Sequence, residues 1–580
     1  MKKYLLLILV ISAGSDVIAQ ELRLEPKPQA IPKQEQVYNL VEKESSLTKA
    51  KVNKPVQKYY LNGRELEFIN IGSSYNAYGF SGGSKNYVWA DNHINSVVFT
   101  HRMIAGPGPS SPGDRVAYDV SWEGGEAGTW HSDNQVYEPF MGNDPARYPQ
   151  GGIINPPGNE LPEDAIYTYF CPVLNISNGN WGGYAYGINF LTEIDPTNPT
   201  RNVDSGTPPY RFIPDAFIVT QEGTTWMAEP SYDEENQQYT GEYIFYMGYM
   251  NDANDDIVYE WWTLDILEAG ELHINDSKIA FDPTSQFGYL CVMSDSPSDP
   301  VPYTDYHPLL YATDDGGESW QEDPIHCQLG GPDGIDSVKY YLPDATLDAI
   351  FGEGQWDRET IFYNMGYHTG FHVDFMGNAH CLGIITPSSE DGWYPNPDVM
   401  GTFHLWYDRQ TKTWDAKLLY MNRTFEGDMG GISMYNRPYI SSDMIGQHLL
   451  FSWLDTDQEG VEENVSPDIY LLAYDLINHD HYEVENVTSH TQAMWSAYWG
   501  SMSHYVFSEL LGNDLICKVP FVYEEADPND PGAEVTFWYI NGFEVIFPGP
   551  WGIEEKTSEN SIIVGQNHPN PFNGKTTIDI

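Results

Sequence analysis

The octet Thr313-Asp314-Asp315-Gly316-Gly317-Glu318-Ser319-Trp320 follows the apolar run Pro308-Leu309-Leu310-Tyr311-Ala312 and is the most informative segment of the chain. Its pattern, Thr-x-Asp-x-Gly-x-Ser-Trp, is typical of a strand, a tight turn and the start of the next strand. The short acceptors Thr313 and Asp315 suit backbone N–H groups across a turn, and Gly317 permits a positive φ. Trp320 supplies a large apolar anchor. The pattern therefore predicts a β-hairpin.

The octet resembles the Asp-box of sialidase-type (BNR-repeat) β-propellers, with Thr313, Asp315, Gly317, Ser319 and Trp320 at all five signature positions. In that family the box folds the hairpin between the third and fourth strands of a blade, away from the substrate face. The resemblance thus implies a fold and leaves the chemistry open. An ordinary Asp/Gly hairpin in another all-β protein is the alternative.

The composition favours an all-β protein. The 580 residues are 14% aromatic, with 41 Tyr, 17 Trp, 52 Gly and 40 Pro, which is typical of many short strands separated by turns. No long stretch shows apolar residues at helical spacing. Strand-like runs continue from residue 66 to 546, and we predict that they form one propeller of six or seven blades.

The spacing of degenerate relatives of the octet leaves that number open. One relative precedes Trp130, a second is Gln221-x-Gly223-x-Thr225-Trp226, and a third precedes Trp414. With Trp320, these tryptophans are spaced by about 94–96 residues, so each interval corresponds to one large blade or to two compact ones.

The formal net charge of −56, from 84 acidic and 28 basic residues, excludes nucleic acid and anionic lipid as favoured partners. The predicted propeller is even more acidic, because between Tyr59 and residue 550 the lysines are only Lys85, Lys278, Lys339, Lys412, Lys417 and Lys518. Bound Ca²⁺ or a high-salt habitat would each fit such a surface.

The five cysteines, Cys171, Cys291, Cys327, Cys381 and Cys517, are scattered and form no Cys-x-x-Cys motif. This pattern disfavours zinc-ribbon and redox sites. Since several lie in strand-like runs, we expect buried free thiols, with at most two disulfides.

Residues 1–19 carry Lys2-Lys3, a short apolar run and a small-residue end, which predicts a secretory signal peptide. The apolar run is too short for a membrane anchor, and no later segment is a span candidate. Residues 20–65 are rich in Lys, Glu, Gln and Pro and are predicted to be a flexible leader.

Beyond a linker at 547–560, residues 561–580 contain Gln566-Asn567-His568-Pro569-Asn570-Pro571-Phe572-Asn573 followed by Thr576-Thr577-Ile578. This segment resembles the opening of the type A C-terminal sorting domain of the type IX secretion system. The resemblance implies a truncated β-sandwich, the secretion machinery as a partner, and a secreted or outer cell-surface location reached via the periplasm.

A sialidase would need three arginines for a carboxylate, a Tyr–Glu nucleophile pair and an Asp acid/base, and Arg suits the first task because its guanidinium matches a carboxylate bidentately. Tyr210-Arg211-Phe212-Ile213-Pro214 resembles the family's Phe/Tyr-Arg-Ile-Pro motif, with Phe212 as an insertion. Arg102, Arg147 and Arg437 stand at predicted strand-to-loop transitions. All four are low-ranking ligand-binding candidates, and structural ion pairs are the main alternative.

No other motif assigns catalysis or a metal. Asp455-x-Asp457-x-Glu459-Gly460 begins like an EF-hand loop, but Ser466 stands at its last ligand position. An irregular structural Ca²⁺ site stays an alternative, and no cofactor is certain. His368 and His372 are interpreted as ordinary histidines of a strand. Trp495 to Trp499 suits either sugar stacking or a blade core.

These observations favour a secreted propeller that binds extracellular glycan or protein ligands. A sialidase-type glycoside hydrolase is the first alternative and a structural surface component the second.

Overall fold

The computed structural model describes residues 55–74, 76–79, 83–102, 115–139, 144–175, 180–194, 202–204, 216–233, 238–265, 274–295, 304–389, 392–425, 432 and 435–549. The predicted signal peptide, most of the leader, Arg211 and the sorting segment 561–580 lie outside these residues.

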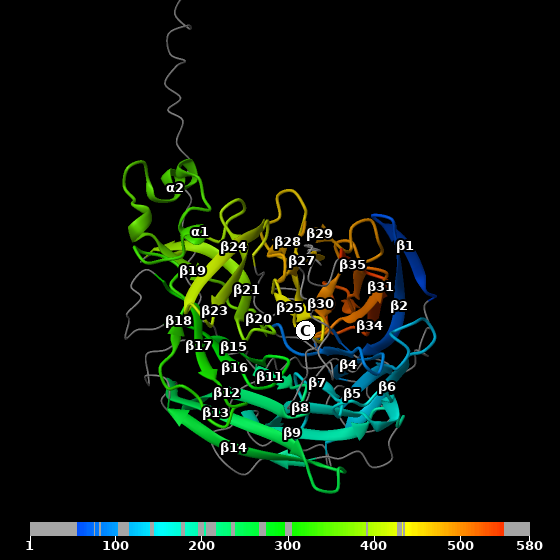
Figure 1. The fold of residues 1–580 in the computed structure, drawn as a ribbon. Coiled ribbons are helices and arrows are strands. Elements are labelled where there is room, and N and C mark those ends of the chain that lie inside the picture. The colour runs from blue at the N-terminus through cyan, green and yellow to red at the C-terminus, as the bar shows by residue number, and fades with distance from the viewer. Residues whose placement is uncertain are drawn as a thin grey trace, which may run out of the picture.

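Seven antiparallel sheets of four or more strands, counted over the described residues, follow one another around a common centre (Figure 1). The chain is thus an all-β propeller, and the choice between six and seven blades is resolved as seven. Blade 1 comprises β3 (Val88–Asp91), β4 (Ser96–Arg102), β5 (Val116–Ser121) and β6 (His131–Tyr137). Blade 2 comprises β7 (Gln150–Ile154), β8 (Ile166–Asn175), β9 (Asn180–Phe190) and β10 (Asn202–Asp204). Blade 3 comprises β11 (Ala216–Val219), β12 (Thr225–Asp233), β13 (Gln238–Met250) and β14 (Ile257–Asp265).

Blades 4 to 6 continue around the ring. Blade 4 comprises β15 (Ile274–Phe281), β16 (Gly288–Ser294), β17 (His307–Thr313) and β18 (Ile325–His326). Blade 5 comprises β19 (Phe362–Met365), β20 (Gly370–Val373), β21 (Ala379–Ser389), β22 (Gly392–Trp393), β23 (Gly401–Asp408) and β24 (Thr413–Met421). Blade 6 comprises β25 (Tyr439–Ser442), β26 (His448–Asp455), β27 (Asp468–Asp475), β28 (Asp480–His481) and β29 (Glu485–Asn486).

Blade 7 joins the two ends of the described chain. Its strand order is β30 (Tyr498–Met502), β33 (Phe521–Glu525), β34 (Val535–Asn541), β2 (Arg64–Ser74) and β1 (Gln57–Leu61). The N-terminal strands therefore complete the last blade and close the ring. A smaller sheet extends from this blade and contains β31 (Phe507–Leu511), β32 (Asp514–Lys518) and β35 (Glu544–Phe547).

The strands begin at Gln57, inside the segment 20–65 that we predicted to be a flexible leader. Strand β1 alternates between half-buried and exposed positions, and Lys58 pairs with both Glu65 and Glu67 of β2. These strands lie at the rim of the ring and are partly exposed, so their sequence is rich in charged residues. That composition is also typical of a flexible leader, which is why the sequence predicted one here.

The octet 313–320 lies between β17 and β18, the third and fourth strands of blade 4. The Thr313 hydroxyl oxygen accepts the Gly317 N–H at 2.9 Å, and the Asp315 carboxylate accepts the Ser319 N–H at 2.9 Å. Gly317 has φ +92°, and a Cβ there would lie 2.4 Å from the ring of Trp226 in the preceding blade. The turn therefore packs one blade against the next.

The degenerate relatives lie in blades 1, 3 and 5, but they do not occupy equivalent positions in those blades. The segment before Trp130 joins β5 to β6 and that before Trp414 joins β23 to β24, whereas Gln221–Trp226 lies between the first and second strands of blade 3. The even spacing of these tryptophans is therefore not a blade period.

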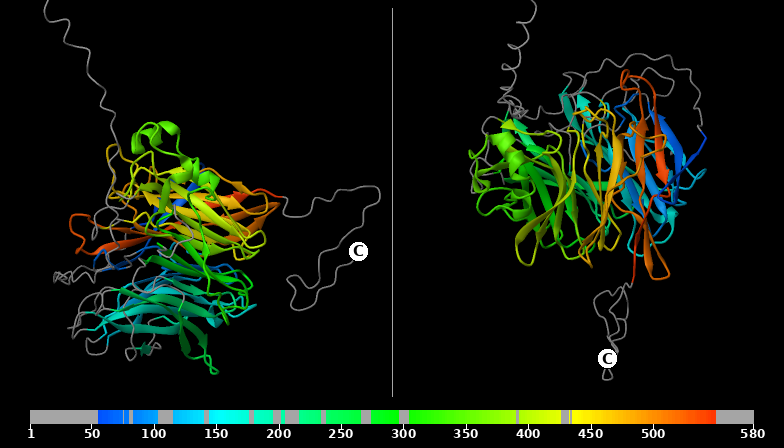
Figure 2. Two further views of the ribbon diagram at one scale, coloured as in Figure 1. Left: turned by 90° about the vertical axis from the view of Figure 1, so that its left-hand side faces the viewer. Right: turned by 90° about the horizontal axis from the view of Figure 1, so that it is seen from above.

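Helices are few and lie outside the sheets. The connection from blade 4 to blade 5 carries α1 (Asp336–Lys339), α2 (Asp344–Phe351) and the 3₁₀ turn η3 (Arg358–Thr360), and they project from the rim of the ring (Figure 2). The 3₁₀ turn η2 spans Pro162–Asp164. Among the described residues no helix is long and apolar enough to span a membrane.

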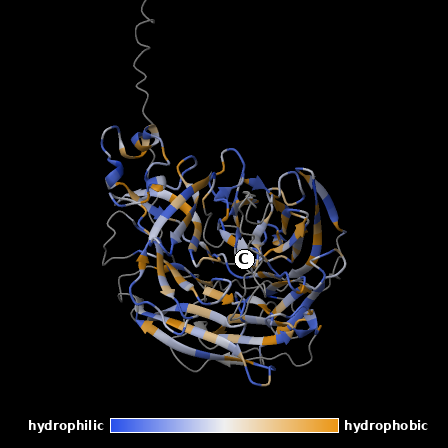
Figure 3. Cartoon of the chain, viewed as in Figure 1, coloured by the Kyte–Doolittle hydropathy of each residue, from blue (hydrophilic) through white to orange (hydrophobic). Residues whose placement is uncertain are grey.

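The blades pack through apolar side chains that alternate along the strands, while hydrophilic residues gather in many of the connections (Figure 3). All five cysteines are buried free thiols, as we expected. Burial raises the pKa of each of Cys171, Cys327 and Cys517.

The propeller has two unlike faces. We call the one that carries the hairpins from first to second and from third to fourth strands the turn face. Its inner hairpins meet over the axis, where the Gln221 amide donates to the Met444 carbonyl at 2.6 Å and the Phe375 N–H donates to the Gly446 carbonyl at 3.2 Å. We call the opposite face, where the inner strands begin, the strand-start face.

Candidate functional site

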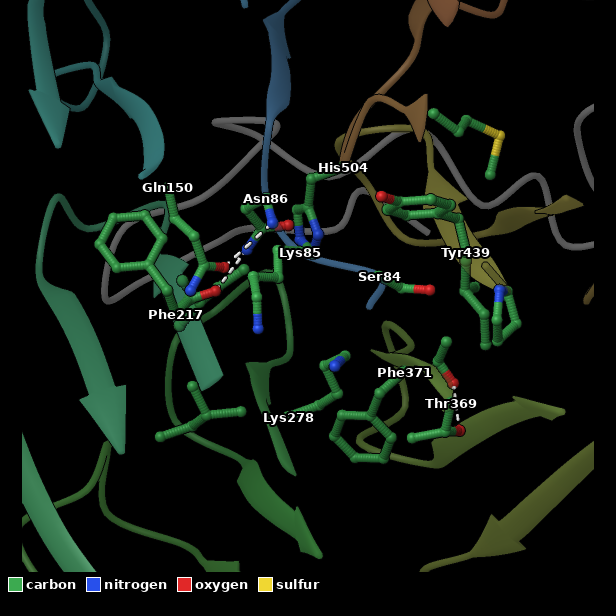
Figure 4. Close-up of a pocket in the computed structure, with 16 residues that line it drawn as sticks. Ser84, Lys85, Asn86, Gln150, Phe217, Lys278, Thr369, Phe371, Tyr439 and His504 are labelled. Atoms are coloured by element: carbon green, nitrogen blue, oxygen red, sulfur yellow. Dashed lines mark hydrogen bonds between the residues drawn. The ribbon is translucent and has the colours of Figure 1, made fainter. Parts of the chain in front are cut away.

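A cavity of about 40 Å³ lies on the propeller axis and is lined by all seven blades (Figure 4). Neighbouring inner strands contact one another around it, and the His504 N–H closes the ring by donating to the Val88 carbonyl at 3.3 Å. The labelled lining residues are Ser84, Lys85, Asn86, Gln150, Phe217, Lys278, Thr369, Phe371, Tyr439 and His504. A water molecule needs about 10–15 Å³ on this measure, so the cavity has room for one small polar group and not for a sugar ring.

Two lysines, Lys85 before β3 and Lys278 on β15, point into this space (Figure 4). Lys278 pairs with the carboxylate of Asp276, whose second oxygen accepts the Thr369 N–H at 2.9 Å. The Lys278 side chain is 13% exposed and Asp276 is fully buried. Lys85 and Lys278 thus line the cavity. The Asp276 carboxylate is held in place by the backbone N–H of Thr369 in blade 5.

Arg437, just before β25, adds a third cation beside the axis. It is fully buried. Its guanidinium donates to the Tyr439 hydroxyl and to the Ser501 hydroxyl, both at 2.9 Å, and lies 5.3 Å from the Tyr87 ring centre and 5.4 Å from that of Trp499. Because these contacts fix its position, Arg437 acts on the cavity through its charge.

His368, which precedes β20, is a buried neutral base. Its Nδ1 lies 3.9 Å from Asp276, and among the described residues neither ring nitrogen has a hydrogen-bond partner. Burial, together with the charges of Lys278, Lys85 and Arg437, lowers the pKa of His368 well below its ordinary value. All three cations therefore disfavour the protonated form of this imidazole.

Glu524, at the end of β33, has the opposite character. It is fully buried, and neither carboxyl oxygen has a hydrogen-bond partner among the described residues. Burial raises the pKa of Glu524 well above its ordinary value, although the charge of Arg437 opposes this shift. Glu229 on β12 is a second buried carboxyl whose pKa burial raises. Both groups favour the protonated, uncharged form.

The resulting charge balance is unusual for this chain. Lys85, Lys278 and Arg437 gather near the axis of a protein with a formal charge of −56, and Asp276 is the carboxylate that pairs with one of them. Glu524 adds little negative charge because it favours the neutral form. The axis is therefore locally positive, and it suits an anionic group.

Three of the four predicted arginines lie in the described residues, and each makes hydrogen bonds of its own. Arg437 lies at the axial site. Arg102, at the end of β4, is buried and donates to the Tyr78 carbonyl at 3.3 Å, and Arg147 donates to the Ala146 carbonyl at 2.7 Å. Tyr78 lies in the connection before blade 1 and Ala146 in the connection before blade 2, and Arg211 lies outside the described residues. A ligand-binding role for these four arginines stays a prediction.

The acidic loop that begins at Asp455, which resembles the start of an EF-hand loop, makes other contacts. Asp455 accepts the N–H groups of Arg423 and Thr424 at 2.9 Å, and Asp457 pairs with Arg423 at 3.0 Å. A structural Ca²⁺ ion stays a prediction.

The tryptophans near residue 495 separate into two roles. Trp499 is 2% exposed and packs in the core, whereas Trp495, in the segment before β30 on the strand-start face, is 43% exposed. Trp495 is therefore the member of the pair that is available for stacking on a ligand.

Sequence reasoning missed the axial group. Lys85 and Lys278 were noted only for the scarcity of lysine, and His368 was interpreted as an ordinary strand histidine. That scarcity was the available signal, because few lysines occur in the propeller and two of them line one cavity.

No protein-family model and no curated protein matches the chain. Solved structures similar to it include the polysaccharide lyase Uly1, with 10% identity over 83% of this chain and 94% of the lyase at a TM-score of 0.38. A PL25 ulvan lyase is 8% identical in sequence, and the match covers 82% of this chain and 95% of the lyase at a TM-score of 0.40. Trypanosoma rangeli sialidase, solved in complex with sialic acid, is 8% identical in sequence, and the match covers 85% of this chain and 57% of the sialidase at a TM-score of 0.29. At these scores the seven-bladed architecture rests on the sheet topology itself.

Proposed function

We propose that this propeller binds an anionic extracellular ligand, with acidic glycans as the favoured class, by seating a carboxylate or sulfate substituent in the axial cavity. The observation that carries the proposal is the placement of Lys85 and Lys278 in one small cavity on the axis of a strongly acidic protein. A buried or half-buried ammonium forms stronger hydrogen bonds to an anion than to a neutral group.

The size of the cavity favours a substituent over a whole ligand. Sites for drug-sized molecules usually measure about 300–1,000 Å³, and this cavity measures about 40 Å³. A sugar acid would therefore place its charged group in the cavity and its ring outside on the strand-start face, where Trp495 offers an exposed aromatic surface.

The proposal includes export. A signal peptide at 1–19 and the sorting motif in 561–580, both recognised from sequence, support a secreted or outer-surface protein carried by the type IX machinery. An extracellular acidic polysaccharide or glycoprotein glycan fits that location, and an anionic protein ligand is the second source of the same charged group.

The test is binding of the full chain to immobilised polygalacturonate, sialylated oligosaccharide and neutral glucan, measured by biolayer interferometry at two salt concentrations. Binding to the acidic glycans, weaker at high salt, is expected, because added ions screen partly exposed charges. Lys85→Gln should weaken binding about 10- to 100-fold, since a hydrogen bond to a charged group contributes about 1.5–3 kcal/mol.

The controls separate charge from fold. Lys412→Gln removes the same charge from an exposed position between β23 and β24 on the turn face and should leave binding unchanged. Lys278→Gln combined with Asp276→Asn removes the buried ion pair together, so that no carboxylate is left unpaired. Equal affinity of Lys85→Gln and Lys412→Gln would refute the axial site.

A glycan-cleaving enzyme is the second candidate, because Glu524 and His368 each carry ionisable atoms without a hydrogen-bond partner among the described residues. Such groups could exchange a proton with a bound substrate. The sialidase form of this candidate would be tested with a fluorogenic sialic acid glycoside, and a broader form by reducing-end release from acidic polysaccharides. Loss of turnover in His368→Gln, with binding retained, would favour catalysis.

A further inference from the structure

A buried group of one histidine and two aspartates lies away from the axial cavity, at the junction of blade 1 and blade 7. His101 is on β4, Asp119 on β5 and Asp133 on β6. One ligand atom from each lies within 4.8 Å of the other two, and this is the one such group of three among the described residues. His101 and Asp119 are fully buried.

The tautomer of His101 is fixed by its surroundings. Its Nδ1 lies 2.8 Å from the Arg102 carbonyl oxygen, and a carbonyl can only accept, so Nδ1 carries a hydrogen. Nε2 then faces the Asp119 carboxylate at 3.2 Å. Two lone-pair atoms at this distance need a positive charge between them, supplied either by a proton or by a metal ion.

The spacing fits a metal ion. Two ligands bound to one tetrahedral Zn²⁺ at about 2.0–2.2 Å lie roughly 3.3–3.6 Å apart, close to the 3.2 Å between His101 Nε2 and Asp119. A second, independent observation is the other oxygen of Asp119, which is fully buried and has no hydrogen-bond partner among the described residues. An unpaired buried carboxylate oxygen is costly, and metal coordination would satisfy it.

Local structure directs Asp133 toward the pair. The pairing of β5 with β6 shifts register between Tyr118 and Val120, and Asp133 has φ +56°. Such a bulge re-aims a side chain. The Asp133 N–H also donates to Asp119 at 2.7 Å, so that the second aspartate is held next to the first.

We propose that His101, Asp119 and Asp133 bind a divalent transition-metal ion, Zn²⁺ in preference, that ties the second, third and fourth strands of blade 1 together where this blade meets the closing blade. An imidazole with carboxylates is a ligand set that suits Zn²⁺, and soft thiolate ligands are absent from the group. The site adjoins β2: a Cβ on Gly72 would lie 2.7 Å from Asp119, and the Ser132 hydroxyl donates to the Ile71 carbonyl.

The position explains why a metal would be useful there. Strand β2 comes from the N-terminal part of the chain and completes blade 7, so the β2 contact with blade 1 closes the ring. His101 stacks on Phe99 and contacts Phe537 of β34 edge-on, with ring centres 5.2 and 4.8 Å apart. The metal would hold the blade 1 side of this aromatic junction rigid, because its three ligands come from three neighbouring strands of that blade.

The experiment measures metal content of the purified full chain by inductively coupled plasma mass spectrometry after dialysis against metal-free buffer. About one divalent ion per chain is expected, falling to background in His101→Gln and in Asp119→Asn. EDTA should lower the Tm, and one equivalent of Zn²⁺ should restore it. The matched control is His448→Gln, because His448 and Asp443 form a buried pair at 3.0 Å outside any such group of three, and this variant should retain the ion.

Absence of metal from the wild-type chain, or equal metal content in all three variants, would overturn the proposal. If His101→Gln and Asp119→Asn do not fold, X-ray absorption at the metal edge of the wild-type chain decides. A shell of nitrogen and oxygen that includes imidazole would support the site, and a shell without imidazole would overturn it.

Discussion

Two sets of buried polar groups, one on each face of the propeller, differ in how their hydrogen bonds are satisfied. On the turn face, Asp374 accepts the N–H groups of Met376 and Asn378 at 2.8 Å and contacts His380 at 3.2 Å. On the strand-start face, Glu524 and His368 are buried without hydrogen-bond partners among the described residues. Satisfied groups stabilise a fold, whereas unsatisfied ones persist where a function offsets their cost. The comparison therefore locates the candidate site on the strand-start face.

A chain of histidines makes the contrast sharper. His380 contacts His404 at 2.8 Å, and His404 contacts His481 at 2.9 Å, which links blade 5 to blade 6 near the turn face. Burial lowers the pKa of His404 well below its ordinary value and that of His481 to about 3. The folded state therefore holds the imidazoles of His404 and His481 neutral.

Acidification should produce the largest effect. The unfolded chain binds protons at His404 and His481 near pH 6.5 and the folded chain does not, so the free energy of unfolding should fall as pH drops below about 6.5. Each fully buried group contributes up to about 1.4 kcal/mol per pH unit. Urea unfolding at pH 7 and pH 5 measures the difference. His404→Asn should flatten the pH dependence, and the exposed control His490→Asn should not.

Removing the charge of Asp374 should come next. Asp374→Asn places an amide where the carboxylate accepts hydrogen bonds, and the expected loss is about 2–4 kcal/mol in the free energy of unfolding, because bonds to a charged group contribute about 1.5–3 kcal/mol each. Chemical denaturation of the purified variant checks this value. A loss below about 1 kcal/mol would show that the turn face does not depend on these bonds.

The matched substitution on the strand-start face, Glu524→Gln, should change the free energy of unfolding least of the three. Glu524→Gln replaces a group that favours its neutral form with a neutral one of similar size, so at pH 5 the free energy of unfolding should change by less than about 1 kcal/mol. Because the pKa of Glu524 is raised in the folded state, its contribution to stability is present below about pH 4.5 and is lost as pH rises. The variant should therefore lose less stability than the wild type between pH 5 and pH 8, and the opposite result would contradict the assigned protonation state.

The sequence predicted those features that depend on neighbours along the chain. The hairpin at 313–320 is one, because the Thr313–Gly317 and Asp315–Ser319 bonds join residues four apart. The all-β class and the buried thiols followed from composition and from apolar strand-like runs. Local chemistry is enough for these, since a turn forms the same contacts wherever the hairpin is placed.

Blade number and the axial site depended on contacts between distant segments. The tryptophan spacing could not give seven blades, because connections differ in length and blade 7 takes β1 and β2 from the other end of the chain. Lys85, Lys278, His368 and Arg437 are separated by up to several hundred residues and meet only because each inner strand begins at the same face of the ring. His101, Asp119 and Asp133 likewise become one group through strand register and a bulge. The sequence determines which residues can carry a charge. The tertiary structure decides which groups surround each of them, through strand pairing within a blade and through the meeting of blades at the axis, and these neighbours set the protonation state and the chemistry of the residue.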